Sequence, residues 1–182
     1  MVGPMPARAK RRLLRRYARE FRLHTLVETG TYLGDTVAAL RRDFGHIYSI
    51  ELSPELAQRA RKRFQTARNV TIVEGDSGIK LAEIVRGLET PTLFWLDGHF
   101  SGGVTARGSL DSPLIAELDT VLNHPATGDV ILIDDAAWLD DQFGGHGLER
   151  IRARIQSAQP QWTIELRNDI LRTHAPLAAP TP

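Results

Sequence analysis

The chain has 182 residues, and its 23 basic and 22 acidic side chains give a net charge of +1. The absence of cysteine excludes disulfides and thiolate metal ligands. No run reaches the roughly 20 apolar residues of a membrane span, and no apolar segment follows the basic N-terminus as in a signal peptide. We therefore expect one domain over residues 1–182, located in the cytoplasm, with a disordered Pro- and Ala-rich tail at 175–182.

Residues 1–23 are strongly basic, with eight Lys or Arg residues and one acid. Leu13, Leu14, Tyr17 and Phe21 recur at helical spacing, which predicts an amphipathic helix with one apolar stripe. We expect this stripe to pack on the rest of the domain while the arginines face solvent. A basic helix can also bind nucleic acid or another acidic partner, so that alternative stays open.

From residue 24 to residue 174, apolar runs typical of strands alternate with helical segments. The predicted strands are His24–Glu28, His46–Glu51, Val70–Glu74, Thr92–Leu96, Asp129–Ile133, Trp162–Leu166 and Ile170–Thr173. The predicted helices between them are 35–42, 54–66, 78–86, 113–123 and 148–156. This alternation predicts an α/β fold with a Rossmann-like, doubly wound, mostly parallel seven-stranded sheet and helices on both faces. The short link 167–169 predicts a C-terminal antiparallel hairpin.

The segment 26–36 is the most informative part of the chain. An apolar run ends in Glu28, and Gly30 and Gly34 follow before a helical pattern begins. Such a turn leaves bare backbone at the carboxyl end of a buried strand, where ligands of open α/β sheets bind. The second predicted strand ends in Glu51, whose carboxylate can accept hydrogen bonds from two ribose hydroxyls. The first half of the chain therefore predicts a nucleoside-binding site.

Acidic residues follow almost every predicted strand. They are Glu28, Glu51, Glu74, Asp76, Asp97, Asp134 and Asp135. Because parallel strands end at one edge of the sheet, so many carboxylates need cations or hydrogen-bond donors opposite them. Asp97 and the pair 134–135 follow strands expected to be adjacent, and three such carboxylates can bind a hard cation such as Mg²⁺. The alternative is that some of them cap helices or pair with arginine.

Five short motifs occur in order at these strand ends. They are Glu28-Thr-Gly30-x3-Gly34-Asp-Thr36, Ser49-Ile-Glu51, Glu74-Gly-Asp76-Ser77, Phe94-Trp-Leu-Asp97 and Ile133-Asp-Asp135. Together they resemble the motifs of class I S-adenosylmethionine-dependent methyltransferases, over about residues 24–174. The chain is most similar to the metal-dependent O-methyltransferases of the catechol and macrocin types. It departs from the usual pattern because its first motif lacks the third glycine of G-x-G-x-G.

The resemblance implies a role for each motif. The residues that would hold the methionine part of S-adenosylmethionine are Glu28, Thr29, Gly30, Gly34 and Thr36. Glu51 would bind the ribose hydroxyls, and Asp76 and Ser77 would lie against the adenine. The residues that would hold Mg²⁺ are Asp97, Asp134 and Asp135, with the third ligand an acid as in the macrocin type. The metal would bind substrate oxygens and activate a hydroxyl, so the expected function is O-methylation of a small hydroxylated molecule.

Two Gly-rich loops are expected near this edge. The loop 98–108 has the composition of a lid that closes over a site. Within it, His99 is a candidate catalytic residue beside Asp97, either as a general base or next to the metal. His146 lies in the second loop and is expected to be solvated. Trp138 is a candidate wall of the substrate pocket.

Two other functions compete with methyl transfer. A nicotinamide dehydrogenase is disfavoured, because G-x-G-x-x-G is absent and Glu28 would lie close to a pyrophosphate. The second is a binding protein that has this fold and engages nucleic acid or an acidic partner through its N-terminal helix. We expect a small-molecule substrate, no membrane partner, and nucleic acid only as the alternative. An open site could also be completed by a second copy in a homodimer.

Overall fold

The computed structural model describes residues 5–97, 113–137, 139 and 144–176. The predicted lid with His99 lies outside the described residues, as does Trp138, so these predictions stay untested. Among the residues described, no helix has both the length and the apolar character needed to cross a membrane.

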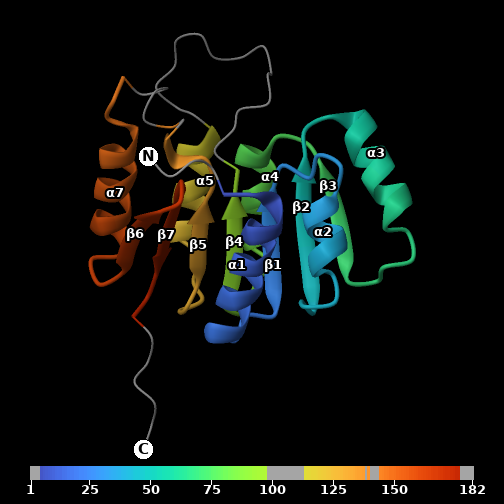
Figure 1. Cartoon of the computed structure of the whole chain (residues 1–182), viewed down its shortest axis with the longest axis horizontal. Helices are drawn as coiled ribbons and strands as arrows, with labels where there is room; N and C mark the ends of the chain where they lie inside the picture. Colours follow the sequence, from blue (N-terminus) through green and yellow to red (C-terminus); the bar gives the residue numbers. More distant parts are fainter. Residues whose placement is uncertain (1–4, 98–112, 138, 140–143, 177–182) are drawn as a thin grey trace, which may run out of the picture.

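Seven strands in the described part of the chain form one sheet, in the order β3-β2-β1-β4-β5-β7-β6 (Figure 1). Their bounds are β1 Thr25–Thr29, β2 His46–Glu51, β3 Val70–Glu74, β4 Thr92–Leu96, β5 Val130–Ile133, β6 Thr163–Arg167 and β7 Ile170–His174. Strands β1 to β5 pair in parallel, whereas β7 is antiparallel to both β5 and β6. The predicted Rossmann-like, mostly parallel sheet with a closing hairpin is confirmed.

Helices cover both faces of this sheet (Figure 1). Their bounds are α1 Ala7–Glu20, α2 Asp35–Leu40, α3 Pro54–Arg63, α4 Ser77–Val85, α5 Pro113–Leu122 and α7 Gly147–Ala158. One hydrophobic cluster joins α1, α2 and α3 to one face, and a second joins α4, α5 and α7 to the other. Successive strand residues supply opposite clusters, as the two-residue period of a strand requires. Leu93 and Trp95 of β4 belong to the first cluster, and Phe94 and Leu96 to the second.

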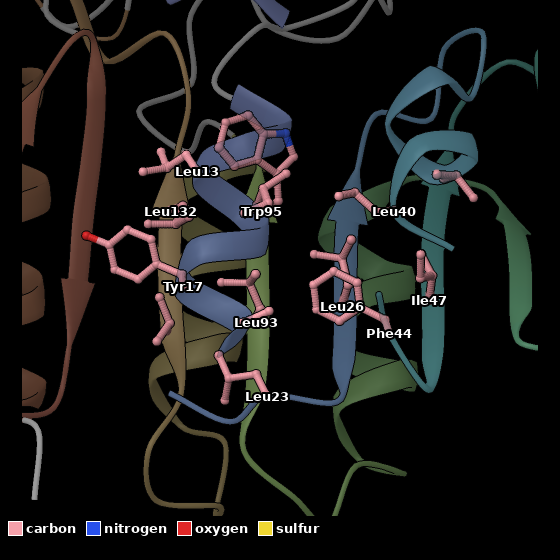
Figure 2. Close-up of a cluster of buried hydrophobic side chains, with 14 of the residues drawn as sticks. Leu13, Tyr17, Leu23, Leu26, Leu40, Phe44, Ile47, Leu93, Trp95 and Leu132 are labelled. Atoms are coloured by element: carbon pink, nitrogen blue, oxygen red, sulfur yellow. The ribbon is translucent and has the colours of Figure 1, made fainter. Parts of the chain in front are cut away.

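The N-terminal helix packs on β4 and β5 through the predicted apolar stripe. Figure 2 shows Leu13 and Tyr17 of α1 lying over Leu93, Trp95 and Leu132 of the sheet, and these side chains are buried. The expectation that the arginines of α1 face solvent fails at Arg15. Arg15 is half-buried: its Nε donates to Asp43 Oδ2 over 2.7 Å, and its Nη2 donates to the Ala39 carbonyl. One basic side chain thus ties α1 to the end of α2.

The C-terminal hairpin turns more tightly than predicted. Arg167 still pairs with Ile170 in the β6–β7 ladder, so only Asn168 and Asp169 form the loop. Both loop residues have positive φ, 52° and 63°. This is the backbone of a type I′ turn, which Asn and Asp tolerate better than most residues because their side chains bond the local backbone. The turn sets the register of β6 against β7.

Candidate functional site

A cavity of about 170 Å³ opens at the carboxyl edge of the sheet, beside the first turns of α1. Its lining residues are Ala7, Lys10, Leu14, Glu28, Gly30, Thr31, Tyr32, Leu33, Asp35, Thr36, Trp95, Asp97 and Asp134. The ends of β1, β4 and β5 therefore meet there, together with the turn that leads into α2. Five residues singled out in the sequence lie in this wall, namely Glu28, Gly30, Thr36, Asp97 and Asp134.

The turn after β1 is built on left-handed backbone. Gly30 and Gly34 have φ values of 85° and 76°, and Tyr32 between them has φ 48°. The amides of Gly30 and Thr31 donate to the Ile50 carbonyl over 2.9 and 3.1 Å, which draws the turn across the end of β2. Glycine is needed at the first position for its φ and because Asp97 leaves little room for a Cβ atom. The backbone is consequently exposed to the cavity, as the sequence predicted.

Glu28 is buried inside this turn and held by hydroxyl groups. The Ser49 hydroxyl donates to Glu28 Oε2 over 2.7 Å, and it also lies 2.6 Å from the Thr31 hydroxyl. Burial raises the pKa of Glu28 to about 8, although the hydrogen bonds from Ser49 and Thr36 act in the opposite direction. At neutral pH the wall of the cavity therefore holds a mostly uncharged carboxyl group.

Glu51 is anchored by backbone amides at the end of β2. Its two carboxylate oxygens accept hydrogen bonds from the Tyr32 amide over 2.7 Å and from the Ser53 amide over 2.9 Å. The residue is only 7% exposed, whereas its register partner Glu74 is exposed and pairs with Arg61 at 2.9 Å. Each carboxylate oxygen has two lone pairs, so these amides fix the carboxylate and still allow it to accept ligand hydroxyls.

Asp76 and Ser77 take local structural roles at the start of α4. Asp76 is the N-cap residue of this helix, and its Oδ1 accepts a hydrogen bond from the Gly78 amide over 2.8 Å. This hydrogen bond satisfies one of the free amides at the start of the helix. The Ser77 side chain is hydrogen-bonded to Glu117. Neither residue lines the cavity, although both lie at the same edge of the sheet.

Glu117 of α5 is a buried acid that the motifs did not reveal. It is 3% exposed and bonds Ser77 and, at 3.5 Å, the Thr29 hydroxyl. Burial raises its pKa to about 7, Asp97 and Asp76 add to that rise, and the two hydroxyls oppose it. The signal in the sequence is its position between Leu114 and Val121, on the apolar face of the helix.

The end of β5 brings two predicted acids together with an unpredicted cation. Lys10 of α1 donates a hydrogen bond to Asp134 Oδ2, and its Nζ lies 3.6 Å from Asp135 Oδ1. Burial raises the pKa of Asp134 to about 6 although the Lys10 bond opposes this rise. Burial acts to lower the pKa of Lys10, but contact with Asp134 and the charges of Asp135 and Asp97 raise it overall. The ammonium and these carboxylates therefore form one coupled charge cluster.

This cluster does not fit the predicted Mg²⁺ site. Over residues 5–97, 113–137, 139 and 144–176, no group of three His, Cys, Asp or Glu side chains is arranged to hold a metal ion. The cation that faces Asp134 and Asp135 is the Lys10 ammonium, and a divalent ion would have to displace it against like-charge repulsion. The three acids predicted as ligands are near one another, but the structure pairs two of them with a lysine.

Large apolar side chains are exposed beside the acids of β1, β2 and β3. They are Tyr32, Leu33, Leu52 and Ile79, with exposed fractions of 68, 42, 48 and 63%. Each follows a strand end directly or after one short turn, so all four belong to the carboxyl edge. Apolar groups near a few fixed polar groups are typical of small-molecule sites.

His146 of the second Gly-rich loop is exposed, and its Nδ1 lies 3.4 Å from Glu149 Oε2. This agrees with the solvated position expected for it.

The fold is shared with solved methyltransferase structures. The O-methyltransferase TomG from Streptomyces achromogenes, in complex with S-adenosylmethionine, aligns with a TM-score of 0.69 and 17% identity over 94% of this chain and 81% of that chain. The O-methyltransferase from Bacillus cereus, in complex with S-adenosylhomocysteine, gives 0.69 and 15% over 94% and 83%. The S-adenosylhomocysteine-bound methyltransferase PaMTH1 from Podospora anserina gives 0.67 and 16% over 94% and 79%. No family model and no curated protein sequence matches the chain. The described part therefore has the class I methyltransferase fold.

Proposed function

We propose that this chain is an S-adenosylmethionine-dependent methyltransferase that methylates a hydroxyl group of a small molecule. The observation that carries the proposal is the placement of Glu51. Its carboxylate is fixed by two amides at the end of β2, next to the glycine turn of β1, on a fold shared with proteins solved with this cofactor or its product. A fixed acid beside a bare turn suits a ligand with ribose hydroxyls and a cationic centre.

We propose that the cofactor lies along the carboxyl ends of β1, β2 and β3. In the proposed arrangement, Glu28, Gly30 and Thr36 of the cavity wall hold the methionine part together with Thr29 and Gly34 of the same turn, and Glu51 binds the ribose hydroxyls. Leu52 and Ile79 offer exposed apolar surface to the adenine, beside Asp76 and Ser77. When bound, the cofactor supplies an electrophilic methyl group.

The chain's own residues would position the acceptor. Asp97 lies in the cavity wall between Gly30 and the Lys10 cluster, and we assign it the role of accepting the proton of the reacting hydroxyl. His99 follows two residues later and stays a second candidate for this role. The proposal contains no metal, because Lys10 supplies the positive charge that faces Asp134 and Asp135.

Calorimetric titration of S-adenosylhomocysteine tests the proposal, with Glu51→Gln and Glu74→Gln compared with the wild type. Glutamine places a donor where Glu51 accepts from an amide, so we expect at least about tenfold weaker binding, equivalent to about 1.4 kcal/mol. Glu74 is the register neighbour on β3 and pairs with Arg61, so its variant should bind as the wild type does. Absence of binding to the wild type, or equal losses in both variants, would contradict the proposed site.

A second candidate function rests on the outer face of α1. Arg8, Arg12, Arg16 and Arg19 are exposed on this helix, whose first turn borders the cavity. Such a row can bind the phosphates of a nucleic acid, in which case affinity falls steeply with salt. Filter binding of RNA at increasing salt, with Arg8, Arg12 and Arg16 changed to Ser, tests it. A steep salt dependence that the triple variant loses would favour this candidate over a small-molecule acceptor.

A further inference from the structure

We propose that Lys10 is a built-in cation that occupies the place of a divalent metal at the end of β5, so that methyl transfer by this chain needs no metal. The part about methyl transfer rests on the proposed function, whereas the exclusion of metal by Lys10 stands on the charge cluster alone. The inference concerns three side chains: Lys10 of α1, and Asp134 and Asp135 after β5.

Lys10 is held in place by the packing of its own helix. Ala7, Lys10, Leu14 and Tyr17 follow one another at spacings of three or four residues, so they share one face of α1. Leu14 and Tyr17 are buried against the sheet, and Ala7, Lys10 and Leu14 line the cavity. Lys10 therefore stands at the end of the apolar stripe and points along it to the carboxyl edge. Its methylene chain can pack on the stripe while the ammonium reaches the acids.

The two aspartates meet this ammonium within a sheltered site. The side chains of Lys10, Asp134 and Asp135 are 21, 9 and 13% exposed. Asp134 has a second hydrogen bond, since its Oδ1 accepts from the Asp135 amide over 3.0 Å. Asp135 has φ 51°, a backbone that turns the chain back on itself after the strand. Both carboxylates are thus positioned by their own local structure, and the cation between them comes from a distant segment of the chain.

The ammonium differs from a metal ion in what it can do. It carries one positive charge and three N–H donors, so it can hold two carboxylates and still donate to an oxygen in the cavity. A divalent ion at the same place would need Lys10 to leave, because two cations about 4 Å apart repel strongly in a partly buried site. The lysine therefore offsets part of the negative charge of the acids and keeps the site closed to divalent metals.

Titration of Mn²⁺ into the full-length protein tests this inference, with binding followed by calorimetry. We expect wild type and Lys10→Arg, which retains the charge, to show no binding at this cluster. Lys10→Met keeps the length of the side chain without its charge, and it should gain measurable Mn²⁺ binding at this cluster. Adding Asp134→Asn to Lys10→Met should abolish the gain.

Two results would overturn the inference. The first is Mn²⁺ binding by the wild type that Asp134→Asn removes, and the second is a folded Lys10→Met protein that gains no binding. Thermal melts check that each variant folds, and Lys10→Gln replaces Lys10→Met if the latter gives no cooperative melt. S-adenosylhomocysteine is titrated in parallel with EDTA present. If neither the wild type nor any variant binds S-adenosylhomocysteine, the proposed function is rejected. The Mn²⁺ titration then still decides the role of Lys10.

Discussion

Gly30 and Asp97 lie so close together that a Cβ atom on Gly30 would be 3.0 Å from Asp97 Oδ2. The two residues follow β1 and β4, which are neighbours in the sheet. The Asp97 amide also donates to the Thr29 hydroxyl over 3.1 Å, so the ends of both strands are fastened to each other. The glycine turn and the predicted catalytic residue Asp97 thus form one continuous wall of the cavity.

Gly30→Ala should therefore damage the site more than its backbone strain alone would. The added methyl group must push Asp97 away, and φ 85° is unfavourable for alanine. Gly145→Ala is the matched control, because its φ is 82° and its Cβ would meet nothing within 4 Å. We expect both variants to lose about 1–2 kcal/mol of stability from strain. Only Gly30→Ala should also weaken S-adenosylhomocysteine binding, and equal binding by both would contradict the close contact.

The order of elements was predictable because local patterns agree with the fold throughout the core. Strands β1 to β5 are short, largely apolar runs that end in an acid or are followed by one, and α3 begins with Ser53 as N-cap and Pro54, as the sequence indicates. The boundaries were less predictable. Helix α2 ends at Leu40 where the pattern extended to residue 42, and α3 ends at Arg63 where it extended to residue 66. Helix ends fray, and periodicity does not show where the last hydrogen bond forms.

The part of the candidate site that the strand ends form was predictable from the sequence, but the contribution of α1 was not. Glu28, Gly30, Asp97 and Asp134 follow strands whose order the topology sets, so their convergence could be inferred. The cation came from a helix more than 120 residues away in sequence, since Lys10 and Asp134 are 124 residues apart. Its position on the apolar stripe of α1 was the available clue. Charge counting placed it only among the eight basic residues of the N-terminal segment.

Asp76 caps α4, and the resemblance implies that it also contacts the adenine. Two variants distinguish these roles. Asp76→Asn retains an oxygen that can accept from the Gly78 amide, whereas Asp76→Ala removes the cap and should cost about 1 kcal/mol of stability. If the Asp76 carboxylate also contacts the adenine, as the resemblance implies, both variants should weaken S-adenosylhomocysteine binding. Chemical denaturation and calorimetry on the two variants check this. Weaker binding by Asp76→Ala alone would limit the role of the residue to shaping the start of α4.

A buried histidine–aspartate pair stabilises the edge of the sheet opposite the site. His124 Nδ1 lies 2.7 Å from Asp129 Oδ2, and His124 Nε2 lies 3.1 Å from the Leu88 carbonyl oxygen. The other oxygen of Asp129 accepts the Thr92 amide over 2.8 Å, so the pair connects the starts of β4 and β5.

His124→Ala should cost about 3 kcal/mol of stability, because it leaves Asp129 and a buried carbonyl without their partner. His146→Ala is the control, since that histidine is exposed, and its effect should stay within about 0.5 kcal/mol. Urea denaturation of both variants measures the difference. A change smaller than about 1 kcal/mol in His124→Ala would show that the network contributes little.

The buried carboxyl group of Glu28 predicts how stability depends on pH. Burial raises its pKa from 4.5 to about 8 in the folded protein, while the unfolded chain ionises near the ordinary value. The folded state therefore retains a proton that the unfolded state has lost, and stability must fall as pH rises between these values. Its contribution is fully present below the unfolded pKa and is lost as pH rises through the folded pKa of about 8.

Glu28→Gln isolates this contribution, because glutamine resembles the protonated acid and does not titrate. We expect the wild type to lose on the order of 3 kcal/mol more than the variant between pH 5 and pH 8, since each pKa unit corresponds to about 1.4 kcal/mol. Glu117 and Asp134 have raised pKa values in both proteins, so their effects cancel in the comparison. Urea denaturation at several pH values provides the curves, with Glu74→Gln as an exposed-acid control that should follow the wild type. Parallel curves for the wild type and Glu28→Gln would mean that Glu28 ionises without cost, and its carboxylate would then face the cavity as a charge.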